Sequence, residues 1–282
     1  GYLCLSSGRI VSCPILKGFD LLQICERQVL KFLLERASRR NFGNHPEMVC
    51  FAHDAISRKI FIDGLFEKRE LLSLKKFLSI NLKQMNTCFD LGANIGNHSL
   101  FFAQLFGNVV SFEPHSRIYK ILALNTESST NIEVVNAGLS DKAGILGAFE
   151  QPLNLGASKI VENSEGNIFF RVVTLDQYVI ETPYNSIDFI KMDVEGHELS
   201  VLKGATQTLK NHRPILALEL HARKDSQKAT QIMVFLRQLG YNYVYYMSID
   251  YLSKNIFNFK KIAINNVKKL PRKNHKMVLF TP

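Results

Sequence analysis

The chain has 282 residues, of which 46% are hydrophobic and 21% are charged, and its formal charge is +10. This balance is typical of a folded globular protein and excludes a disordered chain, and no apolar run approaches the roughly 18 residues of a membrane-spanning helix. Residues 1–250 carry 27 basic and 25 acidic side chains, whereas residues 251–282 carry eight basic and no acidic ones. The excess charge therefore belongs to one C-terminal segment, which suits an anionic partner or a plain solvated surface and disfavours general nucleic-acid binding.

Five cysteines are present, at positions 4, 13, 25, 50 and 88, and no two have C-x-x-C spacing. An odd number without that spacing disfavours a zinc ribbon and a disulfide framework, and it predicts a protein of the reducing cytoplasm. The basic charge of the C-terminal segment, residues 251–282, leaves a second location open, in which the protein lies peripherally on an anionic membrane surface.

The first 50 residues are predicted to form a helical extension, because apolar side chains between Leu21 and Leu33 recur at spacings of three and four. Residues 51–61 are expected to form a short hairpin, and residues 67–82 a second helix with leucines along one side. A boundary at residue 50 thus divides the extension from a main domain, residues 51–282, which includes the basic C-terminal segment and the last strand.

From residue 87 onward, short apolar strands alternate with helices. Strands rich in Val, Ile and Phe are predicted over residues 88–91, 109–112, 132–137, 187–192, 215–220 and 243–247, with a closing strand over 277–280. A polar, glycine-rich stretch up to residue 156 and an edge strand over 168–173 interrupt the pattern. This alternation predicts an α/β fold with a mostly parallel sheet covered by helices on both faces.

The first of these strands continues into a glycine loop that reads Asp90-Leu91-Gly92-Ala93-Asn94-Ile95-Gly96 and precedes a helix. Glycines at such a turn let the backbone approach a ligand at the helix N-terminus. A dinucleotide site would have G-x-G-x-x-G spacing, and an acidic side chain would repel its phosphates. Asp90 instead suits S-adenosylmethionine, which has a sulfonium and an ammonium group and no phosphate. The loop therefore predicts that Asp90, Gly92, Ala93, Asn94 and Gly96 bind this cofactor.

Glu113 ends the second strand, 17 residues after Gly96, where the next strand of a doubly wound fold ends. A carboxylate at this point can accept hydrogen bonds from both ribose hydroxyls, so Glu113 and the adjoining Pro114 are expected to bind the ribose. The end of the third strand, around Ala137, is expected beside the adenine. Asp141 either accepts a hydrogen bond from the adenine amino group or caps its loop.

Asp193 follows the fourth strand, and Glu219 and His221 stand at the end of the fifth. Because the carboxyl ends of parallel strands share one edge, these three residues are expected near the transferred methyl group and are the catalytic candidates. Asp193 is also expected to bind the cofactor. A carboxylate with a pKa of about 4 is a weak base for an alcohol with a pKa of roughly 15. A histidine or a divalent cation would help more, although no motif assigns any metal ligand.

These segments together resemble the FkbM family of S-adenosylmethionine-dependent methyltransferases. The resemblance rests on FDLGANIGNH (89–98), FEP (112–114), NAGLSD (136–141) and KMDVEGHE (191–198), followed by LKGA (202–205), and it covers roughly residues 50–250. It implies a Rossmann-like class I methyltransferase fold, with a seven-stranded, mostly parallel sheet whose last strand is antiparallel. It also implies that Asp90, Gly92 and Asn94 line the methionine part, Glu113 the ribose and Asp193 the reaction centre.

The sequence is therefore interpreted as an O-methyltransferase whose acceptor, by the resemblance, is a hydroxyl of a sugar, a glycan or a secondary metabolite. One alternative is a dinucleotide-dependent oxidoreductase, which the loop spacing and Asp90 disfavour. Another is a non-catalytic binder that grips RNA or anionic lipid through the basic C-terminal segment. If that segment has a partner in the methyltransferase, an anionic or lipid-linked acceptor fits its charge.

Overall fold

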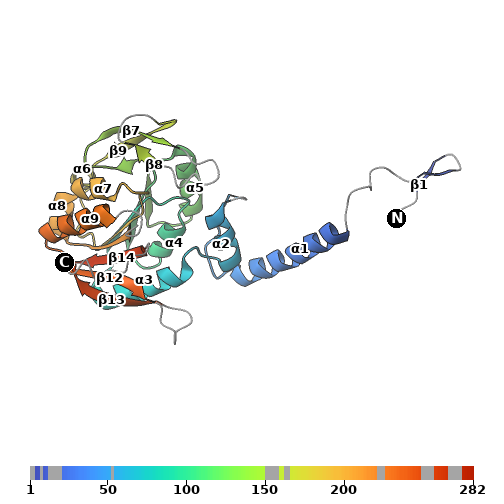
Figure 1. The fold of residues 1–282 in the computed structure, drawn as a ribbon, viewed down its shortest axis with the longest axis horizontal. Helices are drawn as coiled ribbons and strands as arrows, with labels where there is room; N and C mark the ends of the chain where they lie inside the picture. Colours follow the sequence, from blue (N-terminus) through green and yellow to red (C-terminus); the bar gives the residue numbers. More distant parts are fainter. Residues whose placement is uncertain are drawn as a thin grey trace.

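The computed structural model describes residues 4–6, 9–11, 21–51, 54–149, 159–161, 166–220, 226–248, 257–265 and 275–282. The catalytic candidate His221 lies outside these ranges, as do five basic residues of the C-terminal segment: Lys254, Lys268, Lys269, Arg272 and Lys273. In the described part, helices cover both faces of a large sheet, and one long helix points away from this body (Figure 1).

Eight strands of the described residues form the main sheet. Their spatial order is β13 (Asn258–Ala263), β12 (Tyr243–Ser248), β14 (His275–Thr281), β11 (Ile215–Leu220), β10 (Phe189–Met192), β3 (Thr87–Leu91), β4 (Asn108–Phe112) and β5 (Ile132–Val135). From β11 to β5 all neighbours pair in parallel, and β14 lies antiparallel between β11 and β12. This arrangement confirms a mostly parallel sheet with an antiparallel last strand.

The expected number of seven strands is wrong, because β13 pairs antiparallel with the edge of β12 and adds an eighth. The sequence gives little sign of this strand, since its middle is Lys260-Lys261 rather than an apolar alternation. Lysines are typical of edge strands, where the charge discourages pairing with another chain.

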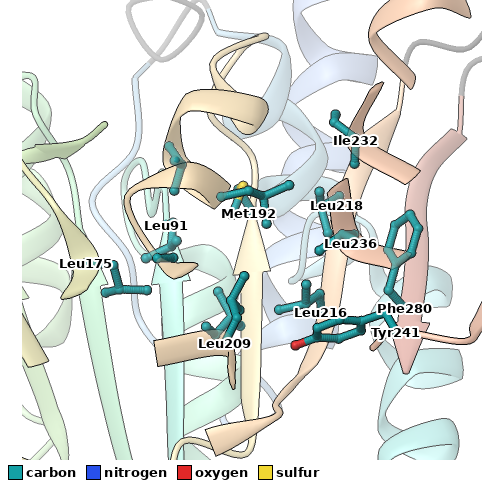
Figure 2. Packing of buried hydrophobic residues seen from close by; sticks show 14 of the residues in the cluster. Leu91, Leu175, Met192, Leu209, Leu216, Leu218, Ile232, Leu236, Tyr241 and Phe280 are labelled. Carbon is teal, nitrogen blue, oxygen red and sulfur yellow. The ribbon is translucent and has the colours of Figure 1, made fainter. Parts of the chain in front are cut away.

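Two apolar clusters pack on opposite faces of the sheet. On β11, Leu216 and Leu218 face one cluster while Ile215 and Ala217 face the other, because successive side chains of a strand point to opposite sides. The first cluster, drawn in Figure 2, packs beneath α6 (Leu175–Glu181), α7 (Glu198–Lys203), α8 (Thr206–His212) and α9 (Ser226–Gln238). The second packs beneath α3 (Lys68–Asn81) and α4 (Asn97–Ala103). Burial on both faces explains why most side chains of these strands are apolar.

A second sheet occupies the stretch that the sequence indicated to be a polar connection ending in an edge strand. Its order is β6 (Gly138–Leu139), β9 (Ile168–Val173), β7 (Gly144–Phe149) and β8 (Lys159–Val161), so β9 has a partner on each side. Strand β7 reads GILGAF and lacks the alternation by which a strand is usually identified. Because β6 comes almost directly after β5, this sheet stands beside the carboxyl edge of the main sheet.

The first 50 residues include α1 (Leu21–Asn41), which spans the range whose spacing predicts a helix, and an antiparallel pair of β1 (Cys4–Ser6) and β2 (Arg9–Val11). The hairpin expected over residues 51–61 is wrong, because α2 (Ala55–Asp63) occupies most of that range. Asp54 caps this helix by accepting from the Ser57 amide, and Gly64 ends it with a φ of 77°. None of the helices in the described ranges is long and apolar enough to cross a membrane.

Candidate functional site

The glycine loop between β3 and α4 is held against the ends of two neighbouring strands. Three of its positions have positive φ: Gly92 (77°), Asn94 (51°) and Gly96 (94°). A Cβ on Gly92 would lie 1.9 Å from the carbonyl oxygen of Asp193, so no other residue fits without moving the end of β10. The amides of Gly92 and Ala93 both donate to the carbonyl oxygen of Phe112, at 3.0 and 2.9 Å. The loop is therefore fixed between β4 and β10.

Glu113 turns its buried carboxylate toward this loop. Its Oε2 accepts a hydrogen bond from the Asn94 amide at 3.0 Å, and its Oε1 accepts one from the His115 amide at 2.9 Å. Burial raises the pKa of Glu113 to about 7, although the two amides favour the charged form and act in the opposite direction. The carboxylate thus ionises near neutral pH, at the point where the sequence predicts ribose binding.

Asp90 and Lys191 form a buried ion pair beneath the loop. The Lys191 Nζ lies 3.1 Å from Asp90 Oδ1, and the Ser99 hydroxyl donates to Asp90 Oδ2 at 2.7 Å. Burial alone would lower the pKa of Lys191, but the carboxylates of Asp90 and Asp193 outweigh it and raise that pKa above its usual value. We expected Asp90 to face the cationic end of a cofactor. In the structure its charge is already compensated by a lysine.

A cavity of about 50 Å³ opens at the carboxyl edge, between the ends of β3, β4 and β10. It brings together five of the predicted cofactor residues: Gly92, Glu113, Pro114, Ala137 and Asp193. Ala93, Asn94 and Gly96 shape the loop without lining this cavity. Asp141 does not reach the cavity either, because its side chain is exposed and accepts a hydrogen bond from the Ser140 hydroxyl at 3.1 Å. The adenine role expected for Asp141 therefore has no support in this geometry.

Further residues line the cavity that the sequence did not single out: Leu91, Phe112, His115, Gly138, Leu139, Phe170, Val194 and Glu195. Those adjoining Asp193 or Glu113 could have been found from their place in the motifs. Phe170 could not, because it comes from β9 of the unforeseen second sheet, where its ring lies 5.9 Å from that of His115. The second sheet thus supplies one wall of the cavity.

The other side of this edge is acidic. The pKa of Glu219 is raised to about 8, first by burial and then by the negative charges of Asp193 and Glu195. At neutral pH the Glu219 carboxyl therefore carries a proton and can donate a hydrogen bond, whereas the sequence suggested a base. Glu195 and Gly196, with φ of 51° and 94°, turn the chain away directly after Asp193. The Asp193 side chain itself is 39% exposed.

The described residues include no group of three or more His, Cys, Asp or Glu side chains that could hold a metal ion. The divalent cation considered from the sequence thus has no such ligand group among these residues, and His221 lies outside them. A larger cavity of about 590 Å³ lies between α1 and α2, but none of the motif residues lines it. The small cavity at the carboxyl edge is the candidate site.

Comparisons with known proteins find similarity to methyltransferases. The family model described as the methyltransferase FkbM domain matches residues 90–243. The hexuronic acid methyltransferase AglP of Haloferax volcanii is 29% identical over 176 residues, which is 61% of this chain and 72% of that protein. A crystal structure of methyltransferase FkbM from Methylobacillus flagellatus matches 91% of this chain with a TM-score of 0.47 and 16% identity, and the chain spans 60% of that protein. Aeropyrum pernix fibrillarin with natively bound S-adenosyl-L-methionine matches 76% of this chain and 73% of its own, with a TM-score of 0.43 and 10% identity.

The family match runs from Asp90, at the start of the glycine loop, to Tyr243, where β12 begins. It therefore includes the loop, Glu113, Asp193 and Glu219, and it covers more than half of the chain. The strand order, with the antiparallel β14 inserted between β11 and β12, is that of the class I fold expected from the motifs, with β13 added at the edge. The chain belongs to the FkbM methyltransferase domain family and has a Rossmann-like class I methyltransferase fold.

Proposed function

We propose that this methyltransferase transfers a methyl group from S-adenosylmethionine to a hydroxyl group of a sugar or glycan. The observation that carries the proposal is the cavity at the carboxyl edge, in which Glu113 and Asp193 line the two sides of Gly92. Ligands of open α/β sheets bind at this edge, where the strand order reverses. A sugar acceptor is supported by the name of the Haloferax relative, a hexuronic acid methyltransferase.

The residues around the cavity fit this cofactor. Glu113 offers two carboxylate oxygens to a pair of ribose hydroxyls, and Gly92 leaves no side chain between the loop and the ligand. When bound, S-adenosylmethionine supplies a methyl group activated by its sulfonium charge. The cavity is smaller than the roughly 300 Å³ of a typical ligand pocket, so cofactor binding has to widen it.

Asp193 and Glu219 have different roles in the proposed reaction. Asp193 lines the cavity and is partly exposed, so its carboxylate can orient the acceptor hydroxyl and accept the proton. Glu219 is protonated at neutral pH and can donate a hydrogen bond to another oxygen of the acceptor. Most of the rate gain would come from holding the acceptor oxygen in line with the methyl group.

An acceptor with an anionic or lipid-linked part is a further proposal that follows from the basic C-terminal segment. Two of its lysines, Lys260 and Lys261, lie in β13, and the Lys261 ammonium sits 3.5 Å from the centre of the Tyr243 ring. This part of β13 is at the edge of the sheet and is mostly exposed. Peripheral contact with an anionic membrane would use the same charges.

Two measurements test the proposed function. Calorimetry should show binding of S-adenosylmethionine and S-adenosylhomocysteine but not of NAD; binding of NAD alone would favour the oxidoreductase alternative. Radiolabelled methyl groups should then pass from the cofactor to a member of a panel of neutral sugars, uronic acids and lipid-linked glycans. Mild alkali should leave the label in place, because an ether resists it, whereas release of the label would identify a carboxyl group as the acceptor.

A further inference from the structure

A row of register partners, polar on three neighbouring strands, lies directly beneath the glycine loop. Ser111 of β4, Asp90 of β3, Lys191 of β10 and Ala217 of β11 are successive register partners. Partner side chains in a parallel sheet point to the same face, and this row faces α4, whose Ser99 hydroxyl bonds to Asp90 and accepts from Ser111 at 2.9 Å. The register therefore places a carboxylate and an ammonium side by side inside the protein.

The Lys191 ammonium makes three contacts with parts of the site. It lies 3.1 Å from Asp90 Oδ1, donates to the Gly92 carbonyl oxygen at 2.9 Å, and lies 3.8 Å from Asp193 Oδ2. Its side chain is only 8% exposed, so solvent screens these contacts little. One buried charge thus touches the end of β3, the cofactor loop and the carboxylate that follows β10.

We propose that Lys191 is a positioning residue for methyl transfer, whose ammonium fixes the Gly92 loop and the Asp193 carboxylate relative to each other. The inference rests on the proposed function, because it assigns the loop to the cofactor and Asp193 to the acceptor. A reacting pair must be held within a few tenths of an ångström, and a mobile carboxylate would lose this alignment. The shared ammonium provides the connection between the two parts.

Neutralising Asp90 does not account for all of these contacts. Asp193 is 39% exposed and could be solvated without a lysine, and the Gly92 carbonyl is a neutral group. The other titratable groups with electrostatic effects around the pair are Cys88 on β3, Glu67 before α3, His98 on α4 and Glu113 after β4. The Asp193 backbone is joined to the loop by its own amide, which donates to the Leu91 carbonyl oxygen at 3.0 Å, whereas the Lys191 ammonium reaches both the Gly92 carbonyl oxygen and the Asp193 carboxylate.

Three variants separate positioning from simple charge balance. Lys191→Met removes the ammonium and leaves Asp90 buried without its partner, which should lower the melting temperature. Asp90→Asn combined with Lys191→Met removes both charges and keeps an acceptor for the Ser99 hydroxyl, so stability should return. Asp90→Asn alone shows what the loss of the Asp90 charge contributes to the double variant. Lys228→Met is the matched control, because Lys228 pairs with another acid, Glu198, at 3.9 Å but does not contact the loop.

Each variant is measured by melting temperature, by calorimetry with S-adenosylhomocysteine and by methyl transfer to the glycan found with the wild-type protein. The double variant should regain the melting temperature lost by Lys191→Met, yet bind S-adenosylhomocysteine about tenfold more weakly and turn over about a hundredfold more slowly than Asp90→Asn alone. Lys228→Met should stay within about twofold of the wild type in S-adenosylhomocysteine affinity and in turnover.

Recovery of binding and turnover together with stability in the double variant would overturn the inference, since Lys191 would then only neutralise Asp90. An equal loss of binding and turnover in Lys228→Met would also overturn the inference, because removal of any buried or partly buried lysine charge would then have the same effect. Failure of the wild-type protein to bind S-adenosylhomocysteine would instead contradict the proposed function. The two failures are therefore distinguishable.

Discussion

The two halves of the carboxyl edge each hold a carboxylate whose pKa is raised by burial, but the groups around the two carboxylates differ. In the cofactor half, burial raises the pKa of Glu113 to about 7 while two backbone amides stabilise its charged form. In the acceptor half, burial and then the neighbouring acids raise the pKa of Glu219 to about 8. Glu113 is thus a fixed hydrogen-bond acceptor in one half, whereas Glu219 retains a proton in the other half.

The difference teaches how one edge can serve two ligands. Preformed amide contacts hold the carboxylate of the cofactor half in one place before any ligand arrives. In the acceptor half, burial and then the charges of Asp193 and Glu195 keep a proton on Glu219, while Asp193 is partly exposed. Substitutions should therefore affect binding in one half and turnover in the other.

The largest effect is expected from Asp193→Asn in the acceptor half. Loss of the carboxylate should reduce turnover by about a hundredfold or more, because the acceptor proton loses its base, while affinity for S-adenosylhomocysteine stays within about threefold. Steady-state transfer and calorimetry measure the two effects. Asp141→Asn, an exposed change outside the cavity, is the control. Unchanged turnover in Asp193→Asn would remove Asp193 from the reaction centre.

Gly92→Ala acts where the two halves meet. The new Cβ would lie 1.9 Å from the Asp193 carbonyl oxygen at a φ of 77°, so stability and cofactor affinity should both fall, the affinity by more than about tenfold. Gly144→Ala is the matched control, since nothing lies within 4 Å of its Cβ, and its melting temperature should change little. Equal behaviour of the two variants in thermal melts would show that the loop has room to relax.

In the cofactor half, Glu113→Gln should weaken cofactor binding by about tenfold, because the ribose hydroxyls lose a charged acceptor. Since the wild-type pKa is about 7 and binding uses the ionised form, wild-type affinity should fall about tenfold from pH 8 to pH 6. The variant should lack this slope, and Glu127→Gln, an exposed change at the C-cap of α5 (Ser116–Thr126), should keep it. Calorimetry across this range would contradict the ribose role if wild type and Glu113→Gln had the same slope.

The smallest effect is expected from Glu219→Gln, and it is measured as the melting temperature at a series of pH values. The Glu219 pKa rises from 4.5 to about 8 on folding, so the folded state binds the proton more tightly, and the resulting stabilisation is lost as the pH rises through about 8. Glutamine mimics the protonated acid and cannot lose a proton. The melting temperature of the variant minus that of the wild type should therefore increase by about 2 °C from pH 5 to pH 9. A constant difference across this range would show that Glu219 titrates normally.

Local pattern was enough to predict the parallel strands, the glycine loop and the candidate residues Glu113 and Asp193. It predicted β9 but missed its partner β7, and it missed β13, because β7 is glycine-rich and β13 is basic in its middle, and both are stabilised by pairing. It also predicted a hairpin where α2 forms, because the apolar run was read as strands and the helix-capping residue Asp54 was overlooked.

The sequence by itself determined the family, the strand–helix alternation and which residues stand at the strand ends, because each depends on short motifs and their order along the chain. Only the tertiary structure decided what those residues face. Register across β3 and β10 pairs Asp90 with Lys191, and the second sheet brings Phe170 to the cavity from another part of the chain. Such contacts arise from the pairing of strands distant in sequence, which no local pattern specifies.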